Sequence, residues 1–259
     1  MAESERKRVA LVTGAGRGLG AAIAKSLARQ SIHIICVSRS RNCEKIAEEI
    51  VADGGSAEAL PVDVSDKNAV EQACVQLLEK HPTIDILVNN AGMFYFGAAV
   101  EKPMALSHKM TMLHSTTPAD LCILFGKKMK ERRCGYILNA SSITAYMGFP
   151  TIAVYQATKS YLLKFSKGLH HELSHYGVKV CCVCPGAVDT DLYNLPVKLR
   201  KRLCAIGVML KPEQIAKRGV RATLNGRKVK IPGPINYFFL FLCFLLPGFV
   251  VDLVKKKYV

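Results

Sequence analysis

Segments rich in apolar and β-branched residues alternate with segments of helical periodicity along most of this chain of 259 residues. Strands are expected over residues 8–13, 33–37, 57–62, 84–88, 136–140, 178–183 and 228–231. Helices are expected over residues 18–30, 43–52, 67–80, 118–132, 152–176 and 212–224. Such alternation indicates a parallel sheet with helices on both faces. Because crossovers between parallel strands are right-handed, the pattern predicts an α/β fold with a doubly wound sheet of about seven strands.

The first expected strand runs into a glycine-rich turn, Thr13-Gly14-Ala15-Gly16-Arg17-Gly18-Leu19-Gly20, which opens the first expected helix. Glycines permit a tight turn and let backbone N–H groups approach a phosphate at the helix N-terminus. A glycine-rich turn in this position is typical of a Rossmann-type fold that binds a dinucleotide. The expected contacts come from Gly14, Arg17, Gly18, Leu19 and Gly20.

The end of the second expected strand indicates which dinucleotide binds. An acidic residue at this position binds the ribose 2′-hydroxyl of NAD(H). Here the strand ends in Val37-Ser38-Arg39 and has no acid. Arg39, together with Arg17, could pair with a 2′-phosphate, because the planar guanidinium matches phosphate oxygens. We therefore expect NADP(H) as the cofactor, and the alternative is that Arg39 only faces solvent.

Tyr155 and Lys159 lie one turn apart on the longest expected helix and so share one face of it. A free phenol has a pKa of about 10, which is too high for ready proton exchange at neutral pH. A nearby fixed cation favours the phenolate and lowers that pKa, which yields a proton donor and acceptor near pH 7. Ser142 lies thirteen residues before Tyr155. Alone, the Tyr155–Lys159 pair is a weak indication of catalysis. The glycine-rich turn strengthens it, because the turn predicts a site for the cofactor that such a pair would act with.

Over about residues 8–235 these motifs closely resemble the short-chain dehydrogenases/reductases. Asp63-Val64 is similar to the pair that meets the adenine in that family, and Asn89-Asn90-Ala91-Gly92 is similar to the segment that lines the cofactor site. The run 185–190, Pro-Gly-Ala-Val-Asp-Thr, resembles the one whose threonine holds the nicotinamide carboxamide. The resemblance adds further residues to the expected cofactor site: Asp63, Val64, Asn90, Gly92, Tyr155, Lys159, Val188 and Thr190. It also implies a homodimer or homotetramer.

The resemblance implies a mechanism in which NADPH delivers hydride to a ketone carbon. Ser142 would donate a hydrogen bond to the carbonyl oxygen, and Tyr155 would give that oxygen a proton or take it back in oxidation. Lys159 would bind the nicotinamide ribose and lower the pKa of Tyr155. Ser141 is the rival for the serine role, but the spacing to Tyr155 favours Ser142.

The chain departs from the family at one position. Where the family usually has an asparagine that kinks the helix before strand five and helps to hold a water in the proton relay, counting back from Ser142 reaches His114. Histidine can donate and accept hydrogen bonds near neutral pH, so His114 could replace the asparagine as a fourth catalytic residue. It could equally be a plain helix residue in a slower enzyme.

The formal net charge of +16 is unevenly placed, because residues 196–259 hold fourteen Lys/Arg and only two acids. This asymmetry suggests an anionic partner such as anionic lipid or a phosphorylated carrier, or else a solvated basic face. A nucleic-acid partner is not expected, since it would require the basic tail to be exposed and the apolar run within it to be buried. The ten cysteines are scattered through the expected strands and helices and have no accompanying histidine cluster, so we expect no metal site and a reducing compartment.

Residues 1–8 are a short polar tail with no apolar segment, so we expect no signal peptide. The run 237–251 has no charged residue and lies between basic clusters at 227–230 and 255–257. It is shorter than the ~20 residues of a spanning helix, and Pro247-Gly248 interrupts it. A shallow hairpin or an interfacial helix held by anionic headgroups fits better; a buried helix over the substrate cleft or a dimer contact is the alternative.

We therefore divide the chain into a single catalytic domain, 1–234, and a hydrophobic, basic-flanked segment, 235–259. The expected location is cytoplasmic and peripheral on a membrane. The leading interpretation is an NADPH-dependent ketoreductase for a long-chain lipid ketone, because residues 207–234 look similar to relatives that reduce 3-oxoacyl thioesters or 3-ketosphinganine. The alternatives are a hydroxysteroid dehydrogenase and a catalytically weak cofactor-binding scaffold at a membrane. Residues 191–210 mix apolar and basic residues and are expected to cover the substrate.

Overall fold

The computed structural model describes residues 6–190, 192 and 196–245. Its centre is a seven-stranded sheet in the order β3-β2-β1-β4-β5-β6-β9, in which all neighbouring strands run parallel. The strands are β1 (Val9–Thr13), β2 (His33–Ser38), β3 (Ser56–Pro61), β4 (Ile86–Asn89), β5 (Gly135–Ala140), β6 (Val178–Val183) and β9 (Val229–Lys230). The strand order reverses between β1 and β4. The predicted doubly wound fold is therefore confirmed.

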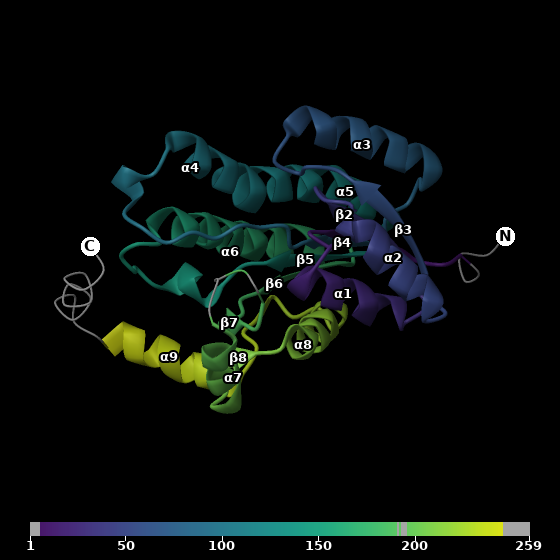
Figure 1. The fold of residues 1–259 in the computed structure, drawn as a ribbon. Helices are drawn as coiled ribbons and strands as arrows, with labels where there is room; N and C mark the ends of the chain where they lie inside the picture. The colour runs from purple at the N-terminus through teal and green to yellow at the C-terminus, as the bar shows by residue number, and fades with distance from the viewer. Residues whose placement is uncertain (1–5, 191, 193–195, 246–259) are drawn as a thin grey trace.

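Helices cover both faces of this sheet (Figure 1). One layer contains α1 (Gly18–Ala28), α2 (Asn42–Ala52) and α8 (Pro212–Leu224). The other contains α3 (Lys67–Lys80), α5 (Thr117–Arg132) and α6 (Ala153–Ser174). Strand side chains alternate between the two layers, so that Ala10 and Val12 of β1 pack with the first layer and Val9 and Leu11 with the second. Both faces of β1 are therefore buried, as its uninterrupted apolar sequence requires.

The bounds of the expected strands and helices agree with the structure to within two residues. The start of β4 is one of the larger differences, because Ile84 and Asp85 precede the strand instead of opening it. Asp85 is engaged at the start of β1, where its Oδ2 accepts the N–H of Val9 at 2.8 Å. Arg6 donates to the other oxygen of Asp85 at 2.6 Å. The carboxylate therefore joins this loop to the first strand.

The weakly patterned region between β4 and α5 is helical for much of its length. It contains a short 3₁₀ turn, η1 (Ala99–Glu101), the helix α4 (Met104–Thr111) and a π-helical turn, η2 (Met112–Thr116), which continues into α5. Only Met110 of α4 is buried, so the helix shows little amphipathic pattern. π-helical turns inside longer helices are frequent at functional sites, and this one contains His114.

The chain after β6 forms smaller elements near one end of the sheet. The strands β7 (Ala187–Val188) and β8 (Met209–Leu210) pair in parallel, and α7 (Val197–Ala205) lies between them in the sequence. The helix α9 (Pro234–Leu245) follows β9 and lies at the lower left of Figure 1. It contains residues 237–245 of the uncharged run 237–251. The possible hairpin at Pro247-Gly248 lies outside the described residues.

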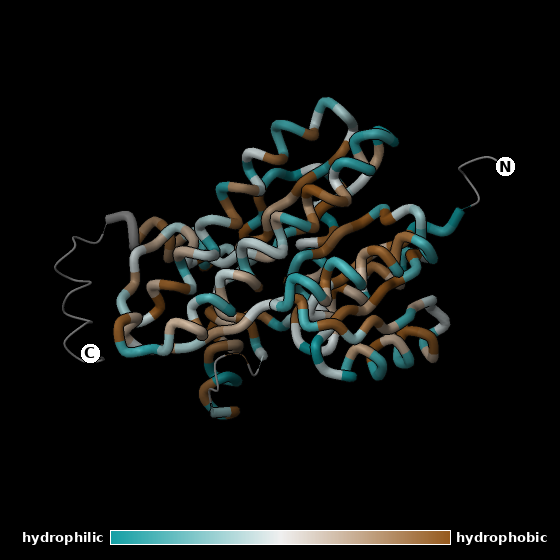
Figure 2. The backbone as a smooth tube through the Cα atoms, turned by 90° about the horizontal axis from the view of Figure 1, so that it is seen from above, coloured by the Kyte–Doolittle hydropathy of each residue, from teal (hydrophilic) through white to brown (hydrophobic). Residues whose placement is uncertain are grey.

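Hydrophobic residues, in brown, follow the central strands in Figure 2, whereas brown and teal alternate along the surrounding helices. The helix α9 differs from those helices, since Phe238 and Phe241 are 58% and 61% exposed. Leu240 on the same helix packs against the cluster around Leu163 and Cys182. Among the described residues, no helix combines the length and the apolar character needed to cross a membrane.

Candidate active site

The turn between β1 and α1 has glycine at positions where the backbone leaves no space for a side chain. Gly14 and Gly18 have φ angles of +69° and +56°, in the left-handed region that glycine adopts most readily. A Cβ atom on Gly20 would lie only 2.1 Å from the carbonyl oxygen of Gly14. The turn is therefore closed against the start of α1, and a larger residue would push it apart.

Thr13 and Asn90 fasten this turn to the loop after β4. Thr13 Oγ1 accepts hydrogen bonds from the backbone N–H groups of Asn90 at 3.0 Å and Ala91 at 3.2 Å. Asn90 Nδ2 donates in return to the carbonyl of Thr13 at 3.2 Å. These bonds join β1 to β4 where the strand order reverses, which is where dinucleotides bind in open α/β sheets.

The N-terminus of α1 is suited to an anion. Its first turn has no acidic residue, and its N-cap residue, the exposed Arg17, makes no side-chain hydrogen bond to the helix. Backbone N–H groups at such a terminus favour a phosphate. Thr190 lies close to the same turn, because a Cβ on Gly18 would be 3.0 Å from Thr190 Cγ2. The structure therefore brings the glycine turn together with the segment that contains Val188 and Thr190.

Two other residues of the expected cofactor site have supporting positions. Leu19 is partly buried and packs against the core beneath α1. Val64 is buried, and its carbonyl accepts a hydrogen bond from Thr117 Oγ1 at 2.7 Å, which fixes the loop after β3 to the start of α5. Their positions indicate that they shape the site through the backbone, with little side-chain surface free for a ligand.

Arg39, after β2, leaves 70% of its side chain exposed, and its Nη1 lies 4.0 Å from Asp63 Oδ2. Lys109 Nζ lies 3.5 Å from the same oxygen, and the N–H and hydroxyl of Ser65 donate to Asp63 Oδ1 at 3.0 and 2.7 Å. Partial burial by itself would raise the pKa of Asp63, but the Ser65 bonds and the two cations outweigh it and keep that pKa below its usual value. The mostly exposed guanidinium of Arg39 remains accessible to a phosphate.

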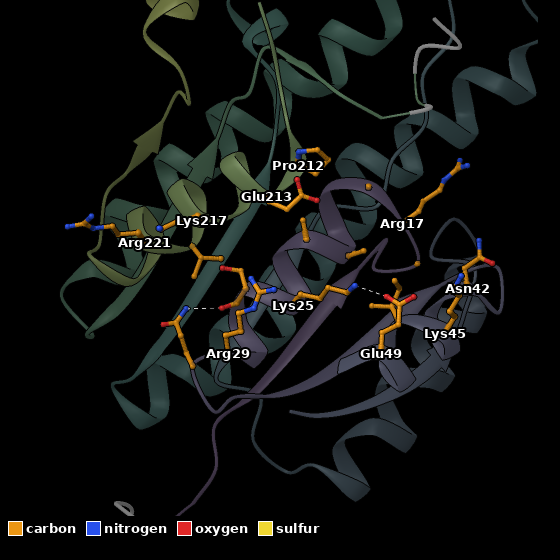
Figure 3. A pocket seen from close by; sticks show the side chains of 18 of the residues that line it. Arg17, Lys25, Arg29, Asn42, Lys45, Glu49, Pro212, Glu213, Lys217 and Arg221 are labelled. Carbon is orange, nitrogen blue, oxygen red and sulfur yellow. Dashed lines mark hydrogen bonds and ion pairs between the residues drawn. The ribbon is translucent and has the colours of Figure 1, made fainter. Parts of the chain in front are cut away.

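A groove of about 890 Å³ begins at the glycine turn and runs along α1 between α2 and α8 (Figure 3). Its walls carry six basic and two acidic side chains: Arg17, Lys25, Arg29, Lys45, Lys217, Arg221, Glu49 and Glu213. Lys25 and Glu49 pair at 2.6 Å, which neutralises one cation. The surplus positive charge makes the surroundings of the glycine turn favourable to a polyanion such as a pyrophosphate.

Tyr155 lies in the first turn of α6 and is 7% exposed. Its ring makes edge-to-face contacts with Phe94 (ring centres 4.8 Å apart) and His114 (5.5 Å). Lys159 places its Nζ 5.7 Å from the centre of the Tyr155 ring. The Lys159 ammonium therefore lies over the face of the Tyr155 ring.

Lys159 is enclosed more completely than a lysine usually is. Its side chain is buried, and Nζ donates a hydrogen bond to the carbonyl of Ala140 at the end of β5, at 2.9 Å. Burial lowers the pKa of Lys159 from 10.5 to about 8. The ammonium form therefore still predominates at pH 7, but Lys159 loses its proton more readily than a lysine in solvent does.

The two neighbouring serines have different hydrogen-bond roles. Ser141 Oγ donates to the carbonyl of Lys159 at 2.8 Å, which uses its hydroxyl hydrogen inside the protein. Ser142 caps the short helix η3 (Ile143–Tyr146), where its Oγ accepts the N–H of Thr144 at 3.2 Å. A hydroxyl that accepts in this way keeps its own hydrogen for donation. The geometry therefore favours Ser142 as the donor to a substrate carbonyl.

Both ring nitrogens of His114 are engaged with neighbouring segments. Nε2 accepts the N–H of Met93 at 3.0 Å, and Nδ1 lies 3.0 Å from Thr158 Oγ1. Thr158 Oγ1 itself donates to the carbonyl of Tyr155 at 2.8 Å. The hydroxyl hydrogen is thereby used, so Nδ1 must carry the proton that joins the ring to Thr158.

Burial, together with the nearby charge of Lys159, holds the pKa of His114 well below its usual value. The imidazole is therefore neutral, with one nitrogen donating and the other accepting. It also fills the space beside Gly92, where a Cβ would lie 2.9 Å from His114 Nε2. His114 thus connects the loop after β4 to the helix that contains Tyr155 and Lys159.

Apolar and aromatic side chains gather around Tyr155: Met93, Phe94, Tyr95, Met110, Phe149, Ile152 and Val154. Gln156 fixes the loop beneath them, because its Oε1 accepts the N–H of Phe149 at 2.7 Å and its Nε2 donates to the carbonyl of Phe149 at 3.1 Å. The surroundings of the phenol are therefore largely apolar.

On the side of Thr190, α7 is joined to Asp189 by Arg200, whose Nε donates to Asp189 Oδ1 at 2.7 Å.

Sequence reasoning missed several residues that the structure places at this site. Thr158 joins His114 to Tyr155, and Phe94 contacts the Tyr155 ring. A threonine next to Lys159 in the sequence was a signal that could have been read, since threonine hydroxyls often bond to the preceding helical turn. The contact of Phe94 depends on a loop that carries no periodic pattern.

Comparison with known proteins gives the chain its family. Residues 8–197 match the family model described as short chain dehydrogenase. The 3-oxoacyl-[acyl-carrier-protein] reductase of Synechocystis sp. is 32% identical over 218 residues, which cover 81% of this chain and 86% of that protein. The ketoacyl reductase HetN of Nostoc sp. is 30% identical over 219 residues, which cover 84% of this chain and 76% of HetN.

A solved structure shows the same architecture. A putative NAD(P)-dependent gluconate 5-dehydrogenase from Beutenbergia cavernae, with bound NADP, superposes with a TM-score of 0.79 at 27% identity and covers 86% of this chain and 94% of its own. The chain belongs to the short-chain dehydrogenase/reductase family.

Proposed function

We propose that the protein is an NADP(H)-dependent ketoreductase that reduces a ketone on a long-chain lipid to the hydroxyl, with 3-ketosphinganine or a 3-oxoacyl thioester as the substrate type. The observation that carries this proposal is the position of Tyr155, whose phenol lies near Lys159 and is surrounded by aromatic and apolar side chains. Family membership supports oxidoreduction, and the names of two relatives as ketoacyl or 3-oxoacyl reductases support a ketone substrate.

Each catalytic side chain has one task in this proposal. When bound, NADP(H) supplies hydride to the substrate carbon or takes it up. Ser142 donates its hydroxyl hydrogen to the substrate oxygen, where negative charge develops. Tyr155 gives that oxygen a proton in reduction and removes it in oxidation. Lys159 stabilises the phenolate that remains.

We assign His114 a positioning role. Through Thr158 it is connected to the carbonyl of Tyr155, and through Met93 to the loop after β4. Because both of its nitrogens have partners and the ring is neutral, it holds the Tyr155 helix in place without itself changing protonation during a turnover. An asparagine can make the same pair of bonds, since its amide has both a donor and an acceptor.

The cofactor assignment rests on the charge around the glycine turn. Gly14, Arg17, Gly18, Leu19 and Gly20 hold the pyrophosphate, and Arg39 pairs with the 2′-phosphate at the end of β2, where the sequence has no acid. The remaining contacts come from the residues expected at the adenine and nicotinamide ends: Asp63, Val64, Asn90, Gly92, Tyr155, Lys159, Val188 and Thr190. The NADP in the gluconate 5-dehydrogenase structure supports this choice.

A hydroxysteroid dehydrogenase would use the same Ser142, Tyr155 and Lys159 in the same apolar surroundings, so it is the second candidate. A lipid ketoreductase should turn over faster as the acyl chain lengthens, because each added methylene buries more apolar surface. A weak cofactor-binding scaffold is the third candidate. The intact arrangement of Ser142, Tyr155 and Lys159 argues against it.

The test is NADPH oxidation by the full-length protein with 3-ketosphinganine, 3-oxoacyl thioesters of graded length and a 3-ketosteroid. We expect turnover to rise with chain length and to fall about 10²- to 10⁴-fold in Tyr155→Phe, which keeps the ring but loses the proton. NADPH binding should be unchanged in that variant. Equal turnover in wild type and Tyr155→Phe, or reduction of the steroid alone, would overturn the proposal.

We also propose that α9 rests on an anionic membrane surface. Tyr237, Phe238 and Phe241 are 54%, 58% and 61% exposed, while Asn236 and Leu240 on the same helix are turned toward the protein. Exposed aromatic side chains beside basic residues are typical of interfacial helices. The basic cluster at 255–257 lies outside the described residues.

Sedimentation with vesicles tests this second proposal. The protein should bind vesicles with anionic lipid more tightly than neutral ones, and Phe238→Ser with Phe241→Ser should reduce that binding about tenfold. Turnover of a detergent-dispersed substrate should stay near the wild-type rate, since neither residue touches the catalytic groups. Undiminished vesicle binding by the double variant would refute the assignment of α9.

A homodimer or homotetramer is our expectation from family resemblance, and the outer surfaces of α5 and α6 support it. Ile123 on α5 is 62% exposed and Tyr161 on α6 is 47% exposed. Apolar side chains left on two neighbouring helices favour a protein contact. Analytical ultracentrifugation should give a mass of at least two chains, and Ile123→Lys should shift it toward the monomer.

A further inference from the structure

Two histidines and a glutamate meet at the outer edge of the sheet, at the amino-terminal ends of β2 and β3. His33 opens β2, Glu58 lies in β3, and His81 directly follows α3. One possible ligand atom of each residue lies within 4.8 Å of the others. The rings of His33 and His81 stack with their centres 5.2 Å apart. This cluster lies away from the glycine turn, which is at the opposite ends of the strands.

The hydrogen bonds of the cluster leave the fully buried Nε2 of His33 without a partner. His81 Nε2 lies 2.6 Å from Glu58 Oε1, but His33 Nε2 is 4.0 Å from the same oxygen and is buried with no hydrogen bond. On the other side of the ring, His33 Nδ1 is 2.7 Å from Ser56 Oγ. An imidazole that donates from Nδ1 to a hydroxyl presents a lone pair at Nε2. Metal-binding histidines almost always have such a partner for the second nitrogen.

We propose that His33, Glu58 and His81 bind a divalent transition-metal ion, with zinc as the best match and solvent in the fourth position. Imidazole and carboxylate ligands suit zinc, whereas magnesium and calcium prefer oxygen ligands alone. Zinc–ligand distances of about 2.0–2.2 Å place the donor atoms of a tetrahedral site roughly 3.3 Å apart. The observed separations of 2.6 and 4.0 Å lie on either side of that value, and all three donor atoms lie within 4.8 Å of one another, so the site requires that the side chains rotate when the ion binds.

Lys80 is the competitor for the carboxylate. Its ammonium donates to Glu58 Oε2, but its side chain is 67% exposed and can turn into solvent when an ion binds. The ion would then join the edge strand β3 and its neighbour β2 to the residue that follows α3. We expect it to stabilise the folded protein, because a ligand that binds only the folded state shifts the unfolding equilibrium.

The experiment is calorimetric titration of the chelator-treated, full-length protein with Zn²⁺, together with thermal unfolding at each metal concentration. We expect one ion per chain and an unfolding temperature that rises with Zn²⁺. His33→Ala and His81→Ala should each weaken binding more than 100-fold, and Ser56→Ala about tenfold through loss of the bond to His33. Lys80→Ala should strengthen binding, because the competing cation is removed.

The matched control is His175→Ala, which removes an exposed histidine at the end of α6. It should keep the full affinity for Zn²⁺. NADPH binding by every variant shows that the fold is intact; if a ligand variant fails to fold, Ser56→Ala and Lys80→Ala still decide the question. No binding by wild type, or equal affinities in wild type, His33→Ala and His81→Ala, would show that the cluster is only a hydrogen-bonded contact.

Discussion

The two halves of the sheet hold their functional groups by different means. In the half formed by β1, α1 and β2, the backbone itself makes the site, because the turn closes where Gly20 meets the carbonyl of Gly14. In the half formed by β4, β5 and α6, buried side chains make it. Lys159 bonds to the carbonyl of Ala140 at 2.9 Å, and His114 is joined to Thr158 at 3.0 Å.

The difference matters for energetics. The cofactor turn is formed by backbone groups and is held by the buried contacts of Thr13 and Asn90, so replacing an exposed side chain beside it should change little besides ligand affinity. A buried polar side chain must be paired, because an unpaired one loses its hydration without compensation. Single substitutions in the β4–α6 half should therefore affect both stability and turnover, whereas substitutions of exposed residues at the cofactor turn should affect affinity alone.

The largest effect is expected at Lys159. Lys159→Met should lower turnover by at least about 10²-fold, because the phenolate loses its cation. It should also stabilise the protein without cofactor. A pKa lowered from 10.5 to about 8 means that burial of the ammonium costs about 3 kcal/mol at pH 7. Loss of the bond to Ala140 removes about 1 kcal/mol, which leaves a net gain of about 2 kcal/mol in urea unfolding.

The pH dependence of that gain follows from linkage. The pKa of Lys159 is lower in the folded state than in the unfolded chain, so between pH 8 and 10.5 the unfolded chain binds more protons. The free energy of unfolding of the wild type therefore rises with pH across this window. The stability advantage of Lys159→Met over the wild type should accordingly be smaller at pH 9.5 than at pH 7. The control is Lys164→Met, an exposed lysine on the same helix. A variant that is less stable than wild type at pH 7 would contradict the assignment.

A smaller effect is expected at His114. His114→Leu removes both hydrogen bonds and leaves the partly buried N–H of Met93 without its acceptor, which should cost about 2 kcal/mol of stability. Turnover should fall about tenfold as the Tyr155 helix loosens. His114→Asn should retain most of the activity, because the amide can replace both bonds.

The pH profile distinguishes positioning from proton transfer at this residue. Since burial and the charge of Lys159 keep the pKa of His114 well below its usual value, the ring stays neutral around pH 6.5 and above, where a free histidine would titrate. Wild type and His114→Asn should therefore have rate profiles of the same shape in this range. A step near pH 6.5 that is present in wild type and absent in the asparagine variant would favour proton transfer by His114.

The same contrast explains what the sequence could predict. The strands and the glycine turn follow from apolar alternation and local backbone demands, and the expected sheet is confirmed. The partners of His114 could not be predicted, because they depend on a π-helical turn that has no periodic signature. The meeting of His33, Glu58 and His81 depends on the register of β2 against β3 and on where α3 ends. No local pattern contains that information.

The smallest effect is expected at Arg39, an exposed residue that follows β2 in the half of the sheet that binds the cofactor. Arg39→Ala should weaken NADPH binding about tenfold, or about 1.4 kcal/mol, because solvent screens a side chain that is 70% exposed. NADH binding should not change, since it lacks the 2′-phosphate. Arg41→Ala is the control, because this side chain is 87% exposed two residues further along. Titrations with NADPH and NADH test this prediction. If Arg39→Ala weakened the binding of both cofactors equally, the guanidinium would support the turn and would not bind the 2′-phosphate.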